Sequence, residues 1–133
     1  SLKIDVASYL TPDHDFFITA DINGLNAGSF IVRKTEWSKR WLAMLIKKAS
    51  TTQDCWYEQR QMQNHYRDPE WAPKIAVLGH PSIQDYDYGL YGRGPETPGH
   101  WRKGSLALSL PGTTFDHRLT YIKTFLAGDH IDR

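Results

Sequence analysis

The sequence predicts a mixed α/β fold, with a mixed sheet flanked by helices. Short apolar runs of strand length alternate with segments of helical periodicity, in the order strand, strand, helix, helix, strand, long loop, strand, helix. The 133 residues suffice for one domain with a real core. We therefore expect a single domain over residues 1–133, and a partial one, because the chain begins with Ser1 rather than Met.

The first elements are short. Residues 1–10 suggest a short helix or an irregular segment, and residues 11–15 contain the Pro and Asp of a turn. The apolar run of residues 16–19 predicts a buried strand, and residues 29–33 predict a second.

Two helices are expected next. Thr35 is a suitable N-cap for a helix over residues 36–49, which carries apolar residues at helical spacing. A second helix is predicted at about residues 56–66, since Asp68-Pro69 would end it.

The C-terminal half is predicted to be richer in loops. Strands are expected at residues 74–78 and 106–110, on either side of a loop over residues 80–98. A final amphipathic helix, ended by Gly128, is marked by apolar residues at helical spacing: Phe115, Leu119, Ile122, Phe125 and Leu126.

Composition excludes several classes of protein. The 16 basic and 15 acidic residues form no basic block, which argues against a nucleic-acid partner. No apolar run reaches about 18 residues, so we expect no membrane segment in this chain. The single Cys55 excludes an internal disulfide and a cysteine zinc site, and we expect it to be a buried thiol.

The segment from Asp21 to Arg33 is the most informative part of the chain. Between two apolar runs it holds small and amide residues, which let a ligand or another backbone approach the main chain. Asn23 and Asn26 add hydrogen-bonding groups where bulk is missing. A tight turn and a ligand-lined wall are both consistent with this pattern.

Two other groups of residues could carry chemistry. Glu58-Gln59, at a helix start, could bind sugar hydroxyls or act at a reaction centre, or Glu58 could simply stabilise the helix dipole. The run Asp85-Tyr86-Asp87-Tyr88 could face a sugar or form an ordinary loop rim. The scattered histidines and loop glycines form neither a zinc motif nor a dinucleotide-binding motif.

The stretch from Asp21 to Ser38 resembles the signature of glycosyltransferase family 34, which holds fungal α-galactosyl- and α-mannosyltransferases and plant xyloglucan xylosyltransferases. Glu58-Gln59 lies where that family has an acid followed by Gln. The stretches 80–86 and 103–112 resemble two later family segments in the same order. The resemblance covers most of residues 9–126.

This resemblance implies the C-terminal part of a GT-A fold that transfers a hexose or pentose, with retention of configuration, from a UDP- or GDP-sugar to an oligo- or polysaccharide. It implies catalytic roles for Glu58 and Gln59, beside the reacting carbon or the sugar hydroxyls. The residues implied in donor or acceptor binding are Asp21, Gly24, Asn26, Ala27, Gly28, Ser29, Gln84 and Asp85.

The resemblance also implies Mn²⁺, which neutralises the departing diphosphate in such enzymes. The family's Asp-x-Asp ligands precede the matched segment, while Asp13-His14-Asp15 falls in the turn after that place. Ser109 stands where the family has a metal-binding His, so we assign no metal ligand in this chain.

The resemblance further implies the Golgi, as a type II membrane protein. Two alternatives stay open: a non-catalytic carbohydrate-binding or interaction module, to which the aromatic-rich stretch 86–101 points, and a structural remnant without activity.

Overall fold

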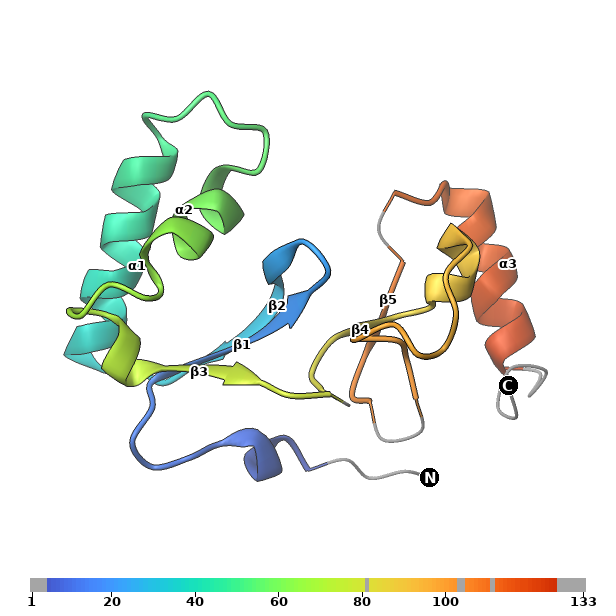
Figure 1. Ribbon diagram of the computed structural model, residues 1–133, viewed down its shortest axis with the longest axis horizontal. Coiled ribbons are helices and arrows are strands. Elements are labelled where there is room, and N and C mark those ends of the chain that lie inside the picture. Colours follow the sequence, from blue (N-terminus) through green and yellow to red (C-terminus); the bar gives the residue numbers. More distant parts are fainter. Residues whose placement is uncertain (1–4, 81, 103–104, 111, 127–133) are drawn as a thin grey trace.

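The computed structural model describes residues 5–80, 82–102, 105–110 and 112–126. Figure 1 shows a three-stranded sheet with helices α1 and α2 at one end of the molecule, and a smaller sheet with helix α3 at the other. The predicted mixed α/β class is confirmed. No helix in the described ranges is long and apolar enough to cross a membrane.

The three-stranded sheet has the order β2-β1-β3. Its central strand β1 (Phe16–Asp21) pairs antiparallel with β2 (Gly24–Val32) and parallel with β3 (Ile75–Leu78). Residues 16–19 are buried, as a continuous apolar run predicts for a central strand. The first two strands are longer than expected because they close into a tight hairpin, so the small-residue segment itself belongs to β2.

Strand β2 contains a bulge in the middle of that segment. Ile18 pairs with Phe30 but the next residue, Thr19, pairs with Asn26. The intervening residues 27–29 therefore have no partner on β1. A bulge bends its strand and redirects the side chains around it, and such features are frequent beside functional sites.

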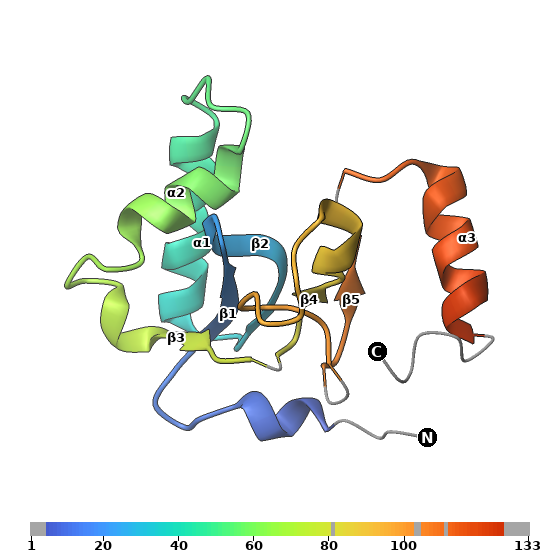
Figure 2. The same ribbon diagram turned by 45° about the vertical axis from the view of Figure 1, so that its right-hand side comes forward.

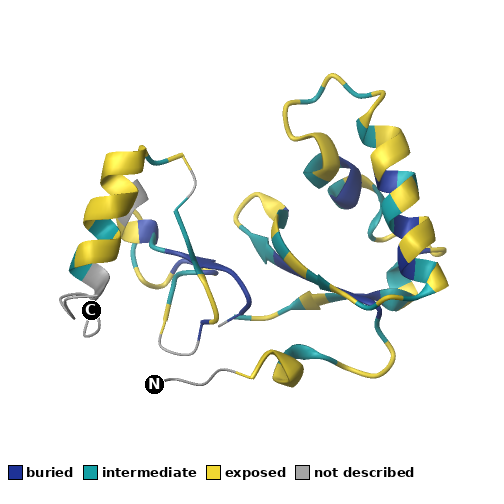
Figure 3. Ribbon diagram, turned by 180° about the vertical axis from the view of Figure 1, so that it is seen from behind, coloured by how far each residue is buried: buried dark blue, intermediate teal, exposed yellow. Residues whose placement is uncertain are grey.

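Helix α1 (Glu36–Ala49) has the predicted bounds, and α2 (Tyr57–His65) is one residue shorter at each end than expected. Trp41 and Leu45 of α1 lie buried in the core with Phe16 and Ile18 of β1. Buried residues lie in this sheet, in the helix faces turned to it, and in residues 82–86 of the other end (Figure 3).

Cys55 is exposed, so the expectation of a buried thiol is wrong. It lies in the turn that precedes α2, where the chain reverses direction outside the core.

The expected loop of residues 80–98 contains a strand, β4 (Asp85–Tyr86), and a 3₁₀ turn, η3 (Tyr88–Tyr91). Strand β4 pairs parallel with β5 (Leu108–Ser109), which is shorter than predicted. Two further 3₁₀ turns are η1 (Val6–Tyr9) and η2 (Ala72–Lys74).

Helix α3 (Phe115–Leu126) forms where expected, and most of its described side chains are exposed. Three of the apolar residues that mark this helix in the sequence are exposed: Phe115, Leu119 and Ile122. Helical periodicity identifies residues that share a face but not what that face contacts. Figure 2 shows α3 at the far side of the smaller sheet from α1 and α2. The predicted stop at Gly128 lies outside the described residues.

Candidate functional site

The β1–β2 hairpin ends in a turn that requires glycine. Gly24 has φ of +101°, a backbone conformation that other residues adopt only with strain. The backbone N–H of Asn23 donates to Oδ1 of Asp21 at 2.6 Å, which fixes the turn. A tight turn is therefore present, and it ends where the small-residue strand β2 begins.

Four side chains beyond this turn form a closed ring of hydrogen bonds. Nδ2 of Asn26 donates to Oδ2 of Asp21 at 2.8 Å, while Oδ1 of Asn26 accepts from Nε2 of Gln84 at 2.9 Å. The same Nε2 donates to the Tyr86 hydroxyl at 2.7 Å, and that hydroxyl is bonded to Asp21. The ring joins the hairpin to the smaller sheet across residues that are far apart in sequence.

The ring leaves one buried acceptor without a partner. The amide hydrogens of Gln84 are both used, but its Oε1 has none, although the side chain is only 3% exposed. A buried carbonyl without a hydrogen bond costs about 1–3 kcal/mol. Such an atom is therefore poised to accept from a hydroxyl or N–H brought by a ligand or by water.

Gly28 makes room for this amide because it has no side chain. A Cβ at position 28 would lie 2.7 Å from Nε2 and 2.8 Å from Oε1 of Gln84. The backbone N–H of Gly28 donates to Oδ1 of Asn26 at 2.8 Å, which holds the bulge in place. The absence of a side chain at position 28 therefore allows the Gln84 amide to occupy its position.

Two glutamine side chains of helix α2 hydrogen-bond to the backbone of the hairpin. Oε1 of Gln59 accepts from the backbone N–H of Ala27 at 3.1 Å, within the bulge. Nε2 of Gln63, one turn later, donates to the carbonyls of Asn23 and Leu25, each at 3.0 Å. The helix therefore fixes the same backbone segment whose side chains form the ring.

Glu58 lies in the first turn of α2 and is exposed to solvent. The residue before it, Tyr57, has φ of +33°, which is uncommon for a non-glycine residue. A shallow hollow of about 260 Å³ is lined by residues 55–59, including Glu58 and Gln59. The carboxylate is thus free to reach a ligand, while its neighbour contacts the small-residue segment.

Asp85 is placed differently from the other predicted residues. It is fully buried and accepts hydrogen bonds from Nδ1 of His80 at 2.6 Å and from the hydroxyls of Ser82 and Ser105. Nε2 of His80 faces the carbonyl of Ala20 at 3.0 Å. This cluster links the smaller sheet to β1, and the Asp85 carboxylate faces its protein partners rather than an open site.

The structure brings Asp21, Asn26, Gly28 and Gln84 together, and places Ala27 and Gln59 in direct contact beside them. Gly24 belongs to the turn, and half-buried Ser29 completes the bulge. Sequence reasoning did not single out Tyr86, Gln63 and His80 as partners of this segment. The spacing of Gln84 and Tyr86 would place them on one face of an extended segment, but the sequence predicted a loop there.

The tyrosines around Asp21 are held in the neutral form. Burial and the Asp21 carboxylate raise the pKa of Tyr86 well above its ordinary value. The same two causes raise the pKa of Tyr88. A neutral Tyr86 hydroxyl keeps the proton that its bond to Asp21 requires.

The described residues contain no cluster of metal-binding side chains. Within the ranges given above, no group of three or more His, Cys, Asp or Glu side chains could hold a metal ion. Asp13 is exposed in its turn and Asp15 is buried, and the half-buried Ser109 offers only a hydroxyl. We therefore assign no step to a metal on this chain.

Comparison with known proteins gives one match. The family model described as the galactosyl transferase GMA12/MNN10 family matches residues 6–118, which is well over half of the chain. No curated protein and no solved structure matches significantly. The matched region contains the hairpin, α2 and the Gln84 ring.

Proposed function

Because the chain belongs to the galactosyl transferase GMA12/MNN10 family, a family of glycosyltransferases, we propose that it forms part of the sugar-donor site of such an enzyme. The reaction is transfer of a hexose or pentose from a UDP- or GDP-sugar to an oligo- or polysaccharide acceptor, with retention of configuration. The observation that carries the proposal is the unpartnered Oε1 of Gln84, buried in front of Gly28.

The donor sugar would approach the bulge over Gly28. A sugar hydroxyl would donate to Oε1 of Gln84, and the second Nδ2 hydrogen of Asn26 is available to a sugar oxygen. The ring of bonds through Asp21 and Tyr86 holds both amides in position before the ligand arrives. Preorganised polar groups of this kind lose little free energy to ordering when a ligand binds.

Glu58 and Gln59 would act at the reacting carbon. Transfer breaks the bond from C1 to the diphosphate, which leaves with the electron pair, and forms a bond from C1 to the acceptor oxygen, whose proton passes to the departing diphosphate. Positive charge develops on the sugar ring, and the exposed Glu58 carboxylate would stabilise it. Gln59, bonded to the Ala27 backbone, would keep the start of α2 against the donor.

Donor binding by the chain tests this proposal. We expect calorimetric titration with UDP-galactose, GDP-mannose and UDP-xylose to identify a donor that binds with a measurable dissociation constant. Gln84→Ala should weaken that binding about tenfold or more, since one hydrogen bond and the ordering of Asn26 are lost. The control is Gln53→Ala, which removes an exposed amide from the loop before α2.

Equal donor affinity in the Gln84 and Gln53 variants would refute the assignment of the ring. For catalysis, the complete enzyme with Glu58→Ala should lose sugar transfer by orders of magnitude while its donor affinity and melting temperature stay close to those of the unaltered protein. A Glu58→Ala enzyme with unchanged turnover would remove this carboxylate from the reaction. Binding of oligosaccharides but of no nucleotide-sugar would favour the non-catalytic carbohydrate-binding alternative.

We also propose that the complete enzyme requires Mn²⁺ and that it is located in the Golgi. A Mn²⁺ requirement is tested by measuring transfer by the complete enzyme after chelation and after Mn²⁺ is restored. The Golgi location is tested by imaging a tagged complete protein against a Golgi marker. Transfer that survives chelation, or a tag found elsewhere in the cell, would refute the respective proposal.

A further inference from the structure

His80 lies on the connection between β3 and β4 and bridges the two sheets (Figure 1). Its Nδ1 lies 2.6 Å from Oδ1 of Asp85 in β4, and its Nε2 lies 3.0 Å from the backbone carbonyl oxygen of Ala20 in β1. The side chain is 18% exposed. Gly99 packs against the ring, since a Cβ there would lie 3.1 Å from Cε1 of His80.

Both ring nitrogens of His80 face an oxygen that can only accept. A neutral imidazole carries a hydrogen on one nitrogen and a lone pair on the other. In the neutral form, one of the two contacts would therefore place a lone pair against an oxygen. The imidazolium ion carries a hydrogen on each nitrogen, so it alone can donate to Asp85 and to Ala20 together.

The surroundings of Asp85 favour a positive charge on this ring. Asp85 is fully buried, and its carboxylate also accepts from the backbone N–H of Ser82 at 3.0 Å and from the hydroxyls of Ser82 and Ser105. Hydrogen bonds donated to a carboxylate stabilise its ionised form. A buried carboxylate is costly unless a positive group lies against it, and His80 is in that position.

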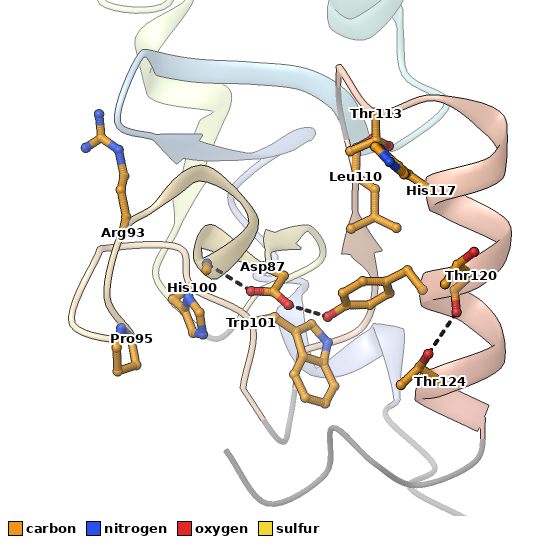
Figure 4. Close-up of a pocket in the computed structure, with 12 residues that line it drawn as sticks. Asp87, Arg93, Pro95, His100, Trp101, Leu110, Thr113, His117, Thr120 and Thr124 are labelled. Atoms are coloured by element: carbon orange, nitrogen blue, oxygen red, sulfur yellow. Dashed lines mark hydrogen bonds between the residues drawn. The ribbon is translucent and has the colours of Figure 1, made fainter.

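The other titratable groups near Asp85 do not supply a positive charge. Tyr9 and Tyr88 have a raised pKa, chiefly because of burial and partly because of the Asp85 charge, so both hydroxyls stay neutral. Asp87 and His100 line a cavity of about 710 Å³ beside α3 (Figure 4). The imidazolium ring is therefore the cation that faces the buried carboxylate.

Each end of this bridge is one residue away from the Gln84 ring. Ala20 precedes Asp21, and Asp85 lies between Gln84 and Tyr86. The ring closes only if the β1–β2 hairpin and β4 lie at the distance that its hydrogen bonds span. The bridge joins the same two elements, so it fixes that distance.

We propose that His80 is a positioning residue, which as an imidazolium ion holds the hairpin and β4 at the separation that closes the Gln84 ring. The effect on donor binding rests on the function proposed above. The protonation of His80 and the closure of the ring do not depend on that function, so they are tested without any ligand.

The first test is NMR of the histidine rings in the unaltered chain at pH 7. Long-range ¹H–¹⁵N correlation shows which ring nitrogens carry a proton, and the signals of His80 are assigned by their absence from the His80→Gln spectrum. We expect both nitrogens of His80 to be protonated. A neutral ring, with one protonated nitrogen, would overturn the proposal.

The second test is hydrogen exchange of the Gln84 side-chain amide, which measures closure of the ring. His80→Phe keeps a flat ring but removes both donors, and it should speed this exchange about tenfold or more. His80→Gln keeps an amide donor for one of the two contacts, so its effect should be smaller. The matched control is His65→Phe, because Nδ1 of His65 lies 2.8 Å from Oδ2 of Asp68 within a single turn of chain and the side chain is 22% exposed.

The backbone N–H of Leu45, in the core, reports global unfolding in the same experiment. We expect its exchange to stay unchanged while that of Gln84 accelerates. Equal acceleration at both positions would assign His80 a purely structural role and overturn the proposal, as would unchanged Gln84 exchange in both His80 variants. If circular dichroism shows that His80→Phe does not fold, the comparison is made with His80→Gln.

Donor titration then links the bridge to the proposed function. His80→Phe should raise the dissociation constant of the donor about tenfold, and His65→Phe should leave it unchanged. Equal donor affinity in the two variants would overturn the positioning role. If no nucleotide-sugar binds the unaltered chain, the donor function fails instead, and the ring spectra and the Gln84 exchange still decide the role of His80.

Discussion

Gly28 is the single residue on which the geometry of the donor site depends most directly. A methyl group at this position would come within 3 Å of three polar atoms, which are Nε2 and Oε1 of Gln84 and Oδ1 of Asn26. The amide cannot move away without breaking its bonds to Asn26 and Tyr86. The absence of a side chain at this position is therefore a structural requirement of the ring.

We predict that Gly28→Ala lowers the free energy of unfolding by about 1–3 kcal/mol, the usual cost of overpacking. Urea denaturation of the variant measures this change. Gly79→Ala is the matched control, because a Cβ there meets no atom within 4 Å. Equal stability of the two variants would show that the Gln84 amide yields without cost.

Buried tyrosines set the response of the protein to alkaline pH. The folded state raises the pKa of Tyr86 and of Tyr121 above the ordinary value of 10.0, chiefly through burial. A raised pKa favours the neutral form in the folded state, so this stability is complete below pH 10 and is lost as pH rises from 10 toward the folded pKa. We predict that the free energy of unfolding falls above pH 10.

Tyr86→Phe should reduce the slope of that fall, because the group that ionises on unfolding is gone. Denaturation at a series of pH values from 8 to 11.5 measures the slopes. Tyr57→Phe is the comparison, since that ring is exposed at the start of α2. A slope unchanged in Tyr86→Phe would mean that Tyr86 ionises equally well in the folded and unfolded chains.

At the scale of single elements, α1 shows what local sequence can determine. Oγ1 of Thr35 accepts from the backbone N–H of Ser38 at 3.2 Å, and Glu36 lies in the favourable first turn. We predict that Thr35→Ala costs about 1 kcal/mol of unfolding free energy and that Thr35→Ser costs much less. Urea denaturation compares the two, and equal losses would assign the effect to the Thr methyl group.

The bounds of α1 were predictable because cap, periodicity and core contacts all lie within one segment. The start of β2 was not, because pairing with β1 extends a strand through small residues that have little strand preference of their own. The bonds of Gln84 to Asn26 join residues 58 positions apart, so the sequence suggested the members of the site but not the ring. The buried surroundings of Asp85 could not be predicted for the same reason, since its hydrogen-bond partners His80 and Ser105 come from two separate segments.

At the scale of the whole molecule, the two ends of the structure differ in how completely they bury apolar surface. The three-stranded sheet packs Phe16, Trp41 and Trp71 into one core. Helix α3 instead exposes Phe115 at 76% and Ile122 at 49%. Exposed apolar residues on one helix face promote association, so we expect this chain to bind hydrophobic dyes and to self-associate as its concentration rises.

The double variant Phe115→Ser, Ile122→Thr should therefore lower the fluorescence of bound ANS and raise the concentration at which light scattering begins. Its melting temperature should stay within a few degrees of the unaltered chain, because neither side chain lies in the core. The control is Val32→Thr, which removes an apolar residue of β2 that is 38% exposed. A steep fall in the melting temperature of the α3 variant would instead mean that its apolar face is packed inside the folded chain.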